Sequence, residues 1–352
     1  MNGVLSYIPY PSWIRPEIIP GLPVRWYGLM YLVAFFITYL LFMFQLRERA
    51  TQTGVPLTAK DKESVLDMFF WAIIGLLVGA RAFAVTIYDP SGYYFQHPLQ
   101  IILPFAVVDG RMRLTGIAGM SYHGGVLGAS VAIITYLKVK KLDALGWGDM
   151  LVSGIPLGYT FGRLGNFING ELYGRITRAS WGMIFPNAES FPANQPWVKD
   201  YAASVGLPVP AGQVLVNLPR HPSQLYEGFF EGLVLWLILW FIVRKRRPYK
   251  GFSIALYMMG YGIIRFFIEY VRQPDKGIGM GGYGYPIVLV KLENFYSQFT
   301  LFNFTTGQIL NVILIAAAAV VMLLLSARAR KPAAPAVEVP HPTGRKLRKK
   351  LK

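Results

Sequence analysis

Apolar residues in this chain gather into seven long runs that are separated by polar segments. A helix that crosses a lipid bilayer needs about 20 mostly apolar residues, and each run is of roughly that length. The predicted spans are Val24–Gln45, Val65–Tyr88, Gly116–Leu137, Trp147–Phe167, Gln224–Val243, Gly251–Tyr270 and Thr306–Leu325. The pattern predicts an all-α polytopic membrane protein with seven transmembrane helices.

Ionisable residues lie inside four of these spans. They are Asp67 and Arg81 in the second, Asp149 and Arg163 in the fourth, Glu227 and Glu231 in the fifth, and Arg265 and Glu269 in the sixth. Charge at membrane depth is costly, and where it occurs it usually serves a function. These spans are therefore expected to carry the functional site.

The distribution of Lys and Arg predicts the orientation in the membrane. Basic residues gather after the first, third, fifth and seventh spans, with RKRRPYK after the fifth and a strongly basic segment after the seventh. Cytoplasmic loops of membrane proteins carry such an excess. The N-terminus is therefore expected outside and the C-terminus in the cytoplasm.

Two segments are expected to extend beyond the spans. Residues 166–220 are rich in Pro, Gly, Asn and aromatic residues, which predicts a small extracytoplasmic cap inserted into a seven-span domain of residues 1–325. Residues 326–352 are rich in Pro and Ala and then in basic residues, which is typical of a disordered cytoplasmic tail. Such a tail is either an anchor on anionic lipid or has a specific role.

Composition agrees with the membrane class and excludes several chemistries. The chain has 352 residues, of which 54% are apolar and 15% charged, whereas soluble domains carry about 25% charged residues. It has no cysteine, so it offers no disulfide, thiolate ligand or thiol nucleophile of its own. Its four histidines show no metal-ligand spacing, so neither metal nor cofactor is expected. The net charge of +17 lies beside apolar segments, which argues against nucleic acid.

The most polar stretch at a span end is FGRLGNFINGELYGR, Phe161–Arg175. It holds Arg163, Asn166, Asn169 and Glu171 among four glycines. Glycine lets a backbone approach a ligand closely, and arginine with amide side chains suits a phosphate head group.

A second cluster follows a spacing of four residues, which puts Tyr261, Arg265 and Glu269 on one helical stripe. An Arg–Glu pair can be a structural lock in the bundle, or its guanidinium can bind a phosphate. With Arg163 at the outer end of another span, convergence of the two arginines on one phosphoryl group is favoured.

Three further candidates lie at or near span ends. His123, in SYHGGVLGAS of the third span, can hydrogen-bond another helix or take a proton near neutral pH, and the glycines beside it suit close helix packing. His221 belongs to RHPSQLYE, which enters the fifth span. Tyr27, in RWYG, fits the aromatic belt of a membrane interface or a contact to lipid.

These motifs, in this order, closely resemble the bacterial prolipoprotein diacylglyceryl transferases. The resemblance rests on RWYGLMY, YHGGVLG, GRLGNFINGELYGR, RHPSQLYE and GYGIIRFFIEYVRQPD and runs from about Val24 to Leu325. It implies an enzyme of the bacterial inner membrane that acts in lipoprotein biosynthesis. The implied reaction transfers the diacylglyceryl group of phosphatidylglycerol to the lipobox cysteine of a prolipoprotein, with glycerol phosphate leaving. The implied partners are phosphatidylglycerol, the prolipoprotein signal peptide and the bilayer.

A mechanism follows as a hypothesis. The thiolate of the substrate is the nucleophile, and His123, with Glu171 or Glu269 behind it, is expected to take the thiol proton. Arg163 and Arg265 are expected to neutralise the departing phosphate. The residues expected to position the lipid are Asn166, Asn169, Tyr27, Tyr261 and His221.

Two other classes share some of these features. A transporter or flippase for anionic lipid would also bury arginines, but it predicts inverted repeats, and none is recognisable in the sequence. A lipid-binding scaffold without catalysis would need no proton acceptor. The transferase is favoured over both.

Overall fold

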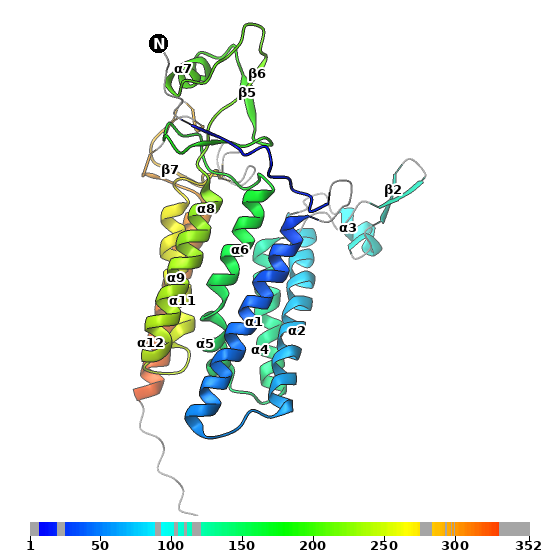
Figure 1. The fold of residues 1–352 in the computed structure, drawn as a ribbon, viewed down its shortest axis with the longest axis vertical. Helices are drawn as coiled ribbons and strands as arrows, with labels where there is room; N and C mark the ends of the chain where they lie inside the picture. The colour runs from blue at the N-terminus through cyan, green and yellow to red at the C-terminus, as the bar shows by residue number, and fades with distance from the viewer. Residues whose placement is uncertain are drawn as a thin grey trace, which may run out of the picture.

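The computed structural model describes residues 7–19, 25–88, 93–101, 105–108, 111–114, 121–274, 284–292, 294–296, 298 and 300–330. Long helices stand side by side in a bundle (Figure 1). The strands β5 and β6 and the helix α7 lie at one end of this bundle, and α3 and β2 project sideways near the same end (Figure 1).

Within the described residues, four helices are long and apolar enough to cross a membrane. They are α1 (Trp26–Thr53), α2 (Ala59–Phe83, continued by η1, Ala84–Tyr88), the helix of residues 223–246, and α12 (Thr306–Arg330). The other bundle helices are shorter: α4 (Tyr122–Val139), α5 (Ala144–Val152), α6 (Ile155–Ile168) and α11 (Phe252–Ile268). The protein is thus mostly helical, with several apolar helices suited to a membrane.

The predicted fourth span, Trp147–Phe167, is not one continuous helix. It is divided into α5 and α6 by a break at Ser153 and Gly154. Pro156, in the first turn of α6, has no backbone N–H with which to continue the ladder of α5. The break lets α6 begin anew, and α6 carries Arg163 on its last turns.

The helix of residues 223–246 contains two wide π-helical stretches. Its parts are α8 (Ser223–Glu227), η3 (Gly228–Val234), α9 (Leu235–Leu237), η4 (Ile238–Val243) and α10 (Arg244–Arg246). Stretches of this kind are rare and often lie at functional sites. Here the first one begins directly after Glu227 and contains Glu231.

Glycines bring α2 and α4 into direct backbone contact, as the interpretation of the glycines beside His123 predicts. A Cβ at Gly79 would lie 2.3 Å from the carbonyl oxygen of Gly124, and one at Gly128 would lie 2.1 Å from that of Gly75. Residues without side chains let two helices approach this closely. The contact holds α4, and with it His123, against the bundle.

Two helix ends differ from the prediction. Helix α4 begins at Tyr122, with Ser121 as its N-cap, and the predicted start at Gly116 lies outside the described residues. His123 therefore lies in the first turn of α4, at the end of this helix. Helix α12 runs to Arg330, so Ser326 to Arg330 are helical and not part of a disordered tail. The remainder of the predicted tail, 331–352, lies outside the described residues.

A small folded unit lies at one end of the bundle, within the predicted cap of residues 166–220. Its elements are β4 (Met183–Ile184), β5 (Ser190–Pro192), α7 (Pro196–Ser204) and β6 (Leu215–Asn217). Strands β5 and β6 pair antiparallel, and β4 pairs parallel with β1 (Ile8–Pro9). Its own apolar core contains Phe191, Val198 and Leu218. The unit also recruits Tyr7 and Tyr296 from distant parts of the chain, which the predicted boundaries do not include.

Short elements also occupy other connections between the bundle helices. Between α2 and α4 they are α3 (Tyr93–Gln96), η2 (Pro98–Ile101), β2 (Phe105–Val108) and β3 (Arg111–Leu114), and before α12 they are β7 (Ile287–Val288) and β8 (Asn303–Phe304). Strands β2 and β3 pair antiparallel, as do β7 and β8. The sequence between β2 and β3 is Asp-Gly, a strong hairpin signal. These strands correct the all-α prediction to a mostly helical fold.

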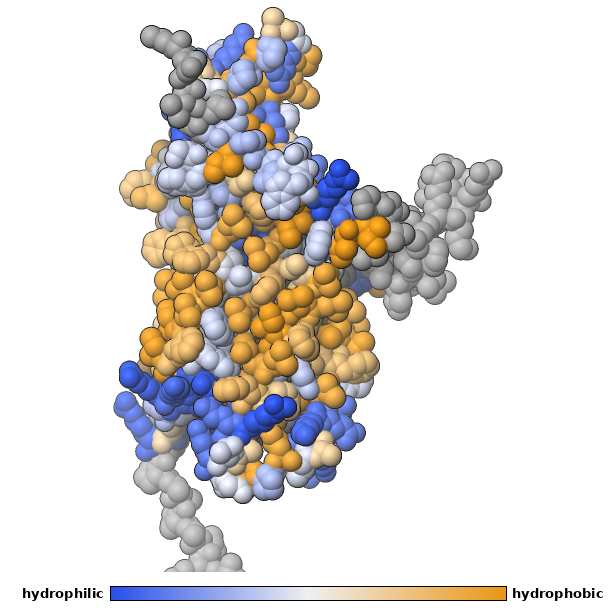
Figure 2. Space-filling model, viewed as in Figure 1, coloured by the Kyte–Doolittle hydropathy of each residue, from blue (hydrophilic) through white to orange (hydrophobic). Residues whose placement is uncertain are grey.

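Hydrophobic residues form a broad orange band around the middle of the bundle, with hydrophilic residues at its lower end (Figure 2). On α1 the four most exposed large apolar residues recur every four positions, at Leu32, Phe36, Leu40 and Phe44. Such a stripe on the outer face of a bundle is costly in water and favourable in lipid. The band therefore agrees with a protein embedded in a membrane.

Candidate functional site

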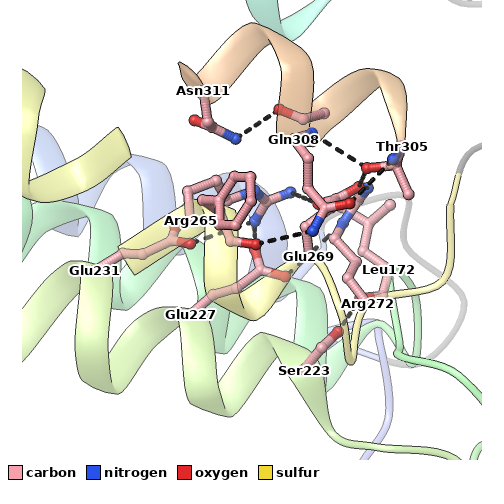
Figure 3. Close-up of polar contacts among 12 residues, drawn as sticks. Leu172, Ser223, Glu227, Glu231, Arg265, Glu269, Arg272, Thr305, Gln308 and Asn311 are labelled. Atoms are coloured by element: carbon pink, nitrogen blue, oxygen red, sulfur yellow. Dashed lines mark hydrogen bonds and ion pairs between the residues drawn. The ribbon is translucent and has the colours of Figure 1, made fainter. Parts of the chain in front are cut away.

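Three arginines and three glutamates form one buried network inside the bundle. The arginines are Arg163 of α6, Arg265 of α11 and Arg272, four residues past α11's end. The glutamates are Glu227, Glu231 and Glu269. Figure 3 shows Glu227 and Glu231 on one helix facing Arg265 and Glu269 on another. Helical spacing of four places each pair on one side of its helix.

Glu227 is the centre of this network. Its Oε2 atom lies 3.1 Å from Nε of Arg163 and 2.8 Å from Nη1 of Arg265. Its Oε1 atom lies 3.9 Å from Nε of Arg272. Its side chain is 0% exposed. Arg163 and Arg265 therefore meet at one carboxylate oxygen of Glu227, and their convergence on a phosphoryl group stays a prediction.

Glu231 lies one turn along the helix from Glu227 and contacts both Arg265 and Tyr159. Its Oε1 atom is 3.5 Å from Nη1 of Arg265, and its Oε2 atom accepts a hydrogen bond from the hydroxyl of Tyr159. The ring of Tyr159 lies under the guanidinium of Arg163, 4.7 Å from its carbon. Glu231 thus supports Arg265 directly and Arg163 through Tyr159.

Glu269 is held by the start of α12. Its carboxylate lies 3.5 Å from Arg265 and 3.8 Å from Arg272, and it accepts a hydrogen bond of 3.3 Å from the hydroxyl of Thr305. Thr305 and Gln308 cap α12 reciprocally through backbone and side chain, which fixes Thr305. A Cβ at Gly307 would lie 2.7 Å from Oε1 of Glu269, so glycine leaves room for the carboxylate in this position.

The motif FGRLGNFINGELYGR, residues 161–175, forms a chain of hydrogen bonds that begins at Arg163. Nη1 of Arg163 donates to Asn166 at 3.2 Å, and the Asn166 amide donates to Glu171 at 3.0 Å. The amide of Asn169 donates to the same Glu171 oxygen at 3.3 Å. The motif therefore holds Arg163 through Nη1 while Nε pairs with Glu227, and it brings its predicted polar residues together.

The motif RHPSQLYE anchors the loop that follows α6. Gln224 donates to the carbonyl of Glu171 at 2.6 Å, and Ser223 donates to that of Leu172 at 3.1 Å. Leu172 has φ of +56°, an unfavourable backbone for a residue other than glycine. A Cβ at Gly174 would lie 2.4 Å from the carbonyl oxygen of Val271. Two distant motifs are thus locked together beside the network.

Tyr27 and Tyr261 border the site on two other helices. Tyr27, in the first turn of α1, packs against Gly165, the residue directly before Asn166, and its hydroxyl is 2.9 Å from that of Tyr31. Tyr261 lies one turn before Arg265, with its ring 6.1 Å from that of Tyr159. The predicted contact of both tyrosines with the lipid stays a prediction.

His123 lies at the edge of the site. Its side chain is exposed, and its ring is 5.7 Å from that of Tyr122. The Tyr122 hydroxyl is 3.5 Å from that of Tyr261, which connects this helix end to the network. The carboxylates of Glu171 and Glu269, predicted to stand behind His123, bind asparagine, arginine and threonine side chains. The role of His123 as a base stays a prediction.

His221 belongs to a different group from the arginines. Its Nδ1 atom is 3.2 Å from the hydroxyl of Tyr226, which also accepts a hydrogen bond from Trp181. Burial, and then the charge of Arg175, lower the pKa of His221 from 6.5 to about 4. The imidazole is therefore neutral at physiological pH.

Acidification is expected to destabilise the protein through His221. Between about pH 6.5 and pH 4 the unfolded imidazole binds a proton and the folded one does not, so stability falls as the pH falls. Allowing for partial exposure to water, the loss is about 1–2 kcal/mol. Thermal unfolding in detergent at pH 7 and about pH 5 measures this loss of stability.

The His221→Gln variant should lose less stability on acidification than the wild type, whereas His97→Gln, at an exposed position, should behave like the wild type. Equal losses in the wild type and His221→Gln would contradict the prediction.

Several partners that complete the network lie outside the residues predicted from the sequence. Glu227 and Glu231 were recognised as charges inside a span but received no role, and Tyr159, Arg272 and Thr305 were not singled out. The spacing of four in Tyr159–Arg163 and in Glu227–Glu231 repeats that of Arg265–Glu269. This signal could have found Tyr159, Glu227 and Glu231, but it does not mark Arg272 or Thr305. Within the part of the chain that the structure describes, no cluster of His, Asp or Glu could hold a metal ion.

Comparison with known proteins agrees with the motifs. The sequence pattern of the family described as prolipoprotein diacylglyceryl transferase matches residues 16–324. The phosphatidylglycerol–prolipoprotein diacylglyceryl transferase of Treponema denticola is 48% identical over 336 residues, covering 93% of this chain and 97% of that protein. The enzyme of the same name from Treponema pallidum is 46% identical over 91% of this chain and 96% of its own. That from Chlorobaculum tepidum is 39% identical over 87% and 88%.

The resemblance that five motifs indicate is thereby confirmed across nearly the whole bundle, from α1 to α12, with every helix that contributes to the arginine–glutamate network included. The chain belongs to the prolipoprotein diacylglyceryl transferase family.

Proposed function

We propose that this protein transfers the diacylglyceryl group of phosphatidylglycerol to the lipobox cysteine of prolipoproteins. The observation that carries the proposal is that Arg163 and Arg265 meet inside an apolar bundle, at one carboxylate oxygen of Glu227. Guanidinium groups bind phosphate oxygens with paired hydrogen bonds. Relatives that align with almost the full chain are named phosphatidylglycerol–prolipoprotein diacylglyceryl transferase. From these names we take phosphatidylglycerol as the donor and a prolipoprotein as the acceptor.

The reaction then runs as a displacement at the glyceryl carbon. The cysteine of the substrate loses its proton and attacks the carbon that carries the phosphate ester, so a thioether S–C bond forms and a C–O bond breaks. Glycerol phosphate leaves with the electron pair of that bond. Arg163 and Arg265 stabilise the charge that develops on the leaving phosphate, and His123 takes the thiol proton.

The other polar residues of the site position the lipid. Asn166 and Asn169 face the same carboxylate, Glu171, and keep Arg163 oriented. Tyr27 and Tyr261 line the arginines from neighbouring helices, and His221 supports the adjoining loop as a neutral group. Glu269 orients Arg265. No metal or cofactor is needed for this chemistry.

The chain is proposed to span the bacterial inner membrane seven times. The four long helices would be joined as spans by α4, by α5 with α6, and by α11. The basic residues after α1, α4, α10 and α12 favour a cytoplasmic C-terminus and an outside N-terminus. The unit around β5, β6 and α7 would then be an extracytoplasmic cap on a transferase domain of residues 1–325, and the basic tail would lie in the cytoplasm.

Purified protein in liposomes decides between the transferase and its rivals. Liposomes would contain labelled phosphatidylglycerol, and a lipobox peptide would be added on the outside. The expected result is an increase in peptide mass equal to a diacylglyceryl group, abolished when the peptide cysteine is replaced by serine. Lipid that crosses leaflets while the peptide stays unmodified would instead identify a flippase, and binding without either would identify a scaffold.

A further inference from the structure

The arginine–glutamate network is electrically balanced before any ligand enters. Its three guanidiniums and three carboxylates sum to zero when all are ionised. Every carboxylate in it is at most 3% exposed. Glu171, which Asn166 links to Arg163, adds a negative charge just outside the network. Among the described residues, the network therefore has no spare positive charge to offer an anion.

An anionic phospholipid disturbs this balance. A phosphodiester carries one negative charge over the whole physiological pH range, and it would bring that charge against Arg163 and Arg265. An uncompensated charge in a buried site is costly, and buried acids commonly escape that cost by binding a proton. One carboxylate of the network is therefore the natural place for a proton when lipid binds.

The contacts of the three glutamates differ in a way that selects one of them. Glu227 has three arginine partners, and Glu269 has two arginines and the Thr305 hydroxyl. Glu231 has one arginine, Arg265, at 3.5 Å. Each of the three carboxylates has one oxygen without a hydrogen-bond partner, so the number of arginine partners is what distinguishes them; the other oxygen of Glu231 accepts from Tyr159. Protonation of Glu231 therefore weakens fewer ion pairs than protonation of Glu227 or Glu269 would.

We propose that Glu231 balances charge in the site, binding one proton from water when an anionic phospholipid occupies the two arginines and releasing it when the anionic product leaves. Glu231 is a positioning residue in this scheme, since it acts on the lipid through Arg265 and Tyr159. The inference rests on the proposed function, because it takes the lipid to be the ligand of Arg163 and Arg265.

The groups that face Glu231 leave it as the candidate for titration. Glu227 faces it from its own helix, Tyr159 and Arg163 from α6, and Tyr257, Tyr261 and Arg265 from α11. Arginines keep their charge at any usable pH. Tyrosines ordinarily ionise only near pH 10. Glu227 is fixed as an anion by its three arginines.

Glu231→Gln provides the decisive variant. Glutamine has the shape of a protonated glutamate, can still accept the hydrogen bond of Tyr159, and cannot ionise. Initial rates are measured against phosphatidylglycerol concentration in mixed micelles, from about pH 6 to about pH 9. The KM of the wild type for this lipid is expected to rise towards high pH, by at most about tenfold per pH unit. The KM of Glu231→Gln is expected to stay low across the range. Glu48→Gln, which removes the partner of Arg244 at the other end of the bundle, should keep the wild-type profile.

A direct count of protons completes the test. Calorimetric titration of the wild type with phosphatidylglycerol in two buffers of different ionisation enthalpy is expected to report an uptake of about one proton per lipid, and Glu231→Gln should report none. Parallel KM profiles, or no uptake by the wild type, would overturn the inference. This count uses no peptide, so it fails independently of the transferase assay, and it needs only the wild type if Glu231→Gln does not fold.

Discussion

Replacing Arg265 with alanine is expected to lower the rate of diacylglyceryl transfer by about 100- to 1000-fold. Loss of one preorganised donor to a developing negative charge typically costs that much, and Arg265 is the residue that touches all three glutamates of the network. Arg265→Lys should also be slow, because lysine lacks the planar fork that binds two oxygens at once. Size-exclusion chromatography first isolates the folded protein. Mass spectrometry of the peptide product then gives the transfer rate per folded molecule.

Arg244 provides the matched control for this substitution. Like Arg265, it is a mostly buried arginine, at 8% exposure, that pairs with a glutamate, but its partner is Glu48 at the opposite end of the bundle. Arg244→Ala should therefore keep most of the transferase rate even if stability falls. Arg265→Ala that retained full rate, or Arg244→Ala that lost as much, would contradict the role given to Arg265.

Local patterns in the sequence predicted much of the bundle and the identity of its key arginines. The apolar runs correspond to α1, α2, α12 and the helix of residues 223–246, because length and hydropathy alone decide whether a helix suits lipid. The pairing of Arg265 with Glu269 follows from a spacing of four within one helix. Arg163 was found because guanidinium and amide groups crowd one short motif.

The rest depends on how distant elements meet, which local patterns do not encode. Glu227 draws arginines from α6, from α11 and from beyond α11, and that set is visible only in three dimensions. The same holds for Thr305, which reaches Glu269 from the start of α12. The break at Pro156 was readable in the sequence, but the apolar run around it outweighed this single residue. The predicted cap boundaries omitted Tyr7 and Tyr296 because these residues join its core from far along the chain.

Replacing Glu227 with alanine is expected to destabilise the bundle strongly. Removal of one partner from a buried ion pair costs about 3–5 kcal/mol, because the remaining charges stay buried without compensation. Here the remaining charges would be the guanidiniums of Arg163, Arg265 and Arg272. Glu227→Gln should be less severe, since its amide oxygen can still accept hydrogen bonds. Thermal unfolding of the detergent-solubilised protein, with the yield of monodisperse material, measures both.

Glu48 shows why depth decides the size of this effect. It also pairs with an arginine, but its side chain is 36% exposed whereas that of Glu227 is 0% exposed. Solvent then replaces much of the lost interaction, and exposed pairs contribute only about 0–1 kcal/mol. Glu48→Ala should accordingly shift the unfolding temperature far less than Glu227→Ala. Similar shifts for the two variants would mean that the three arginines can stay buried without Glu227. The network would then stabilise the bundle by packing rather than by charge.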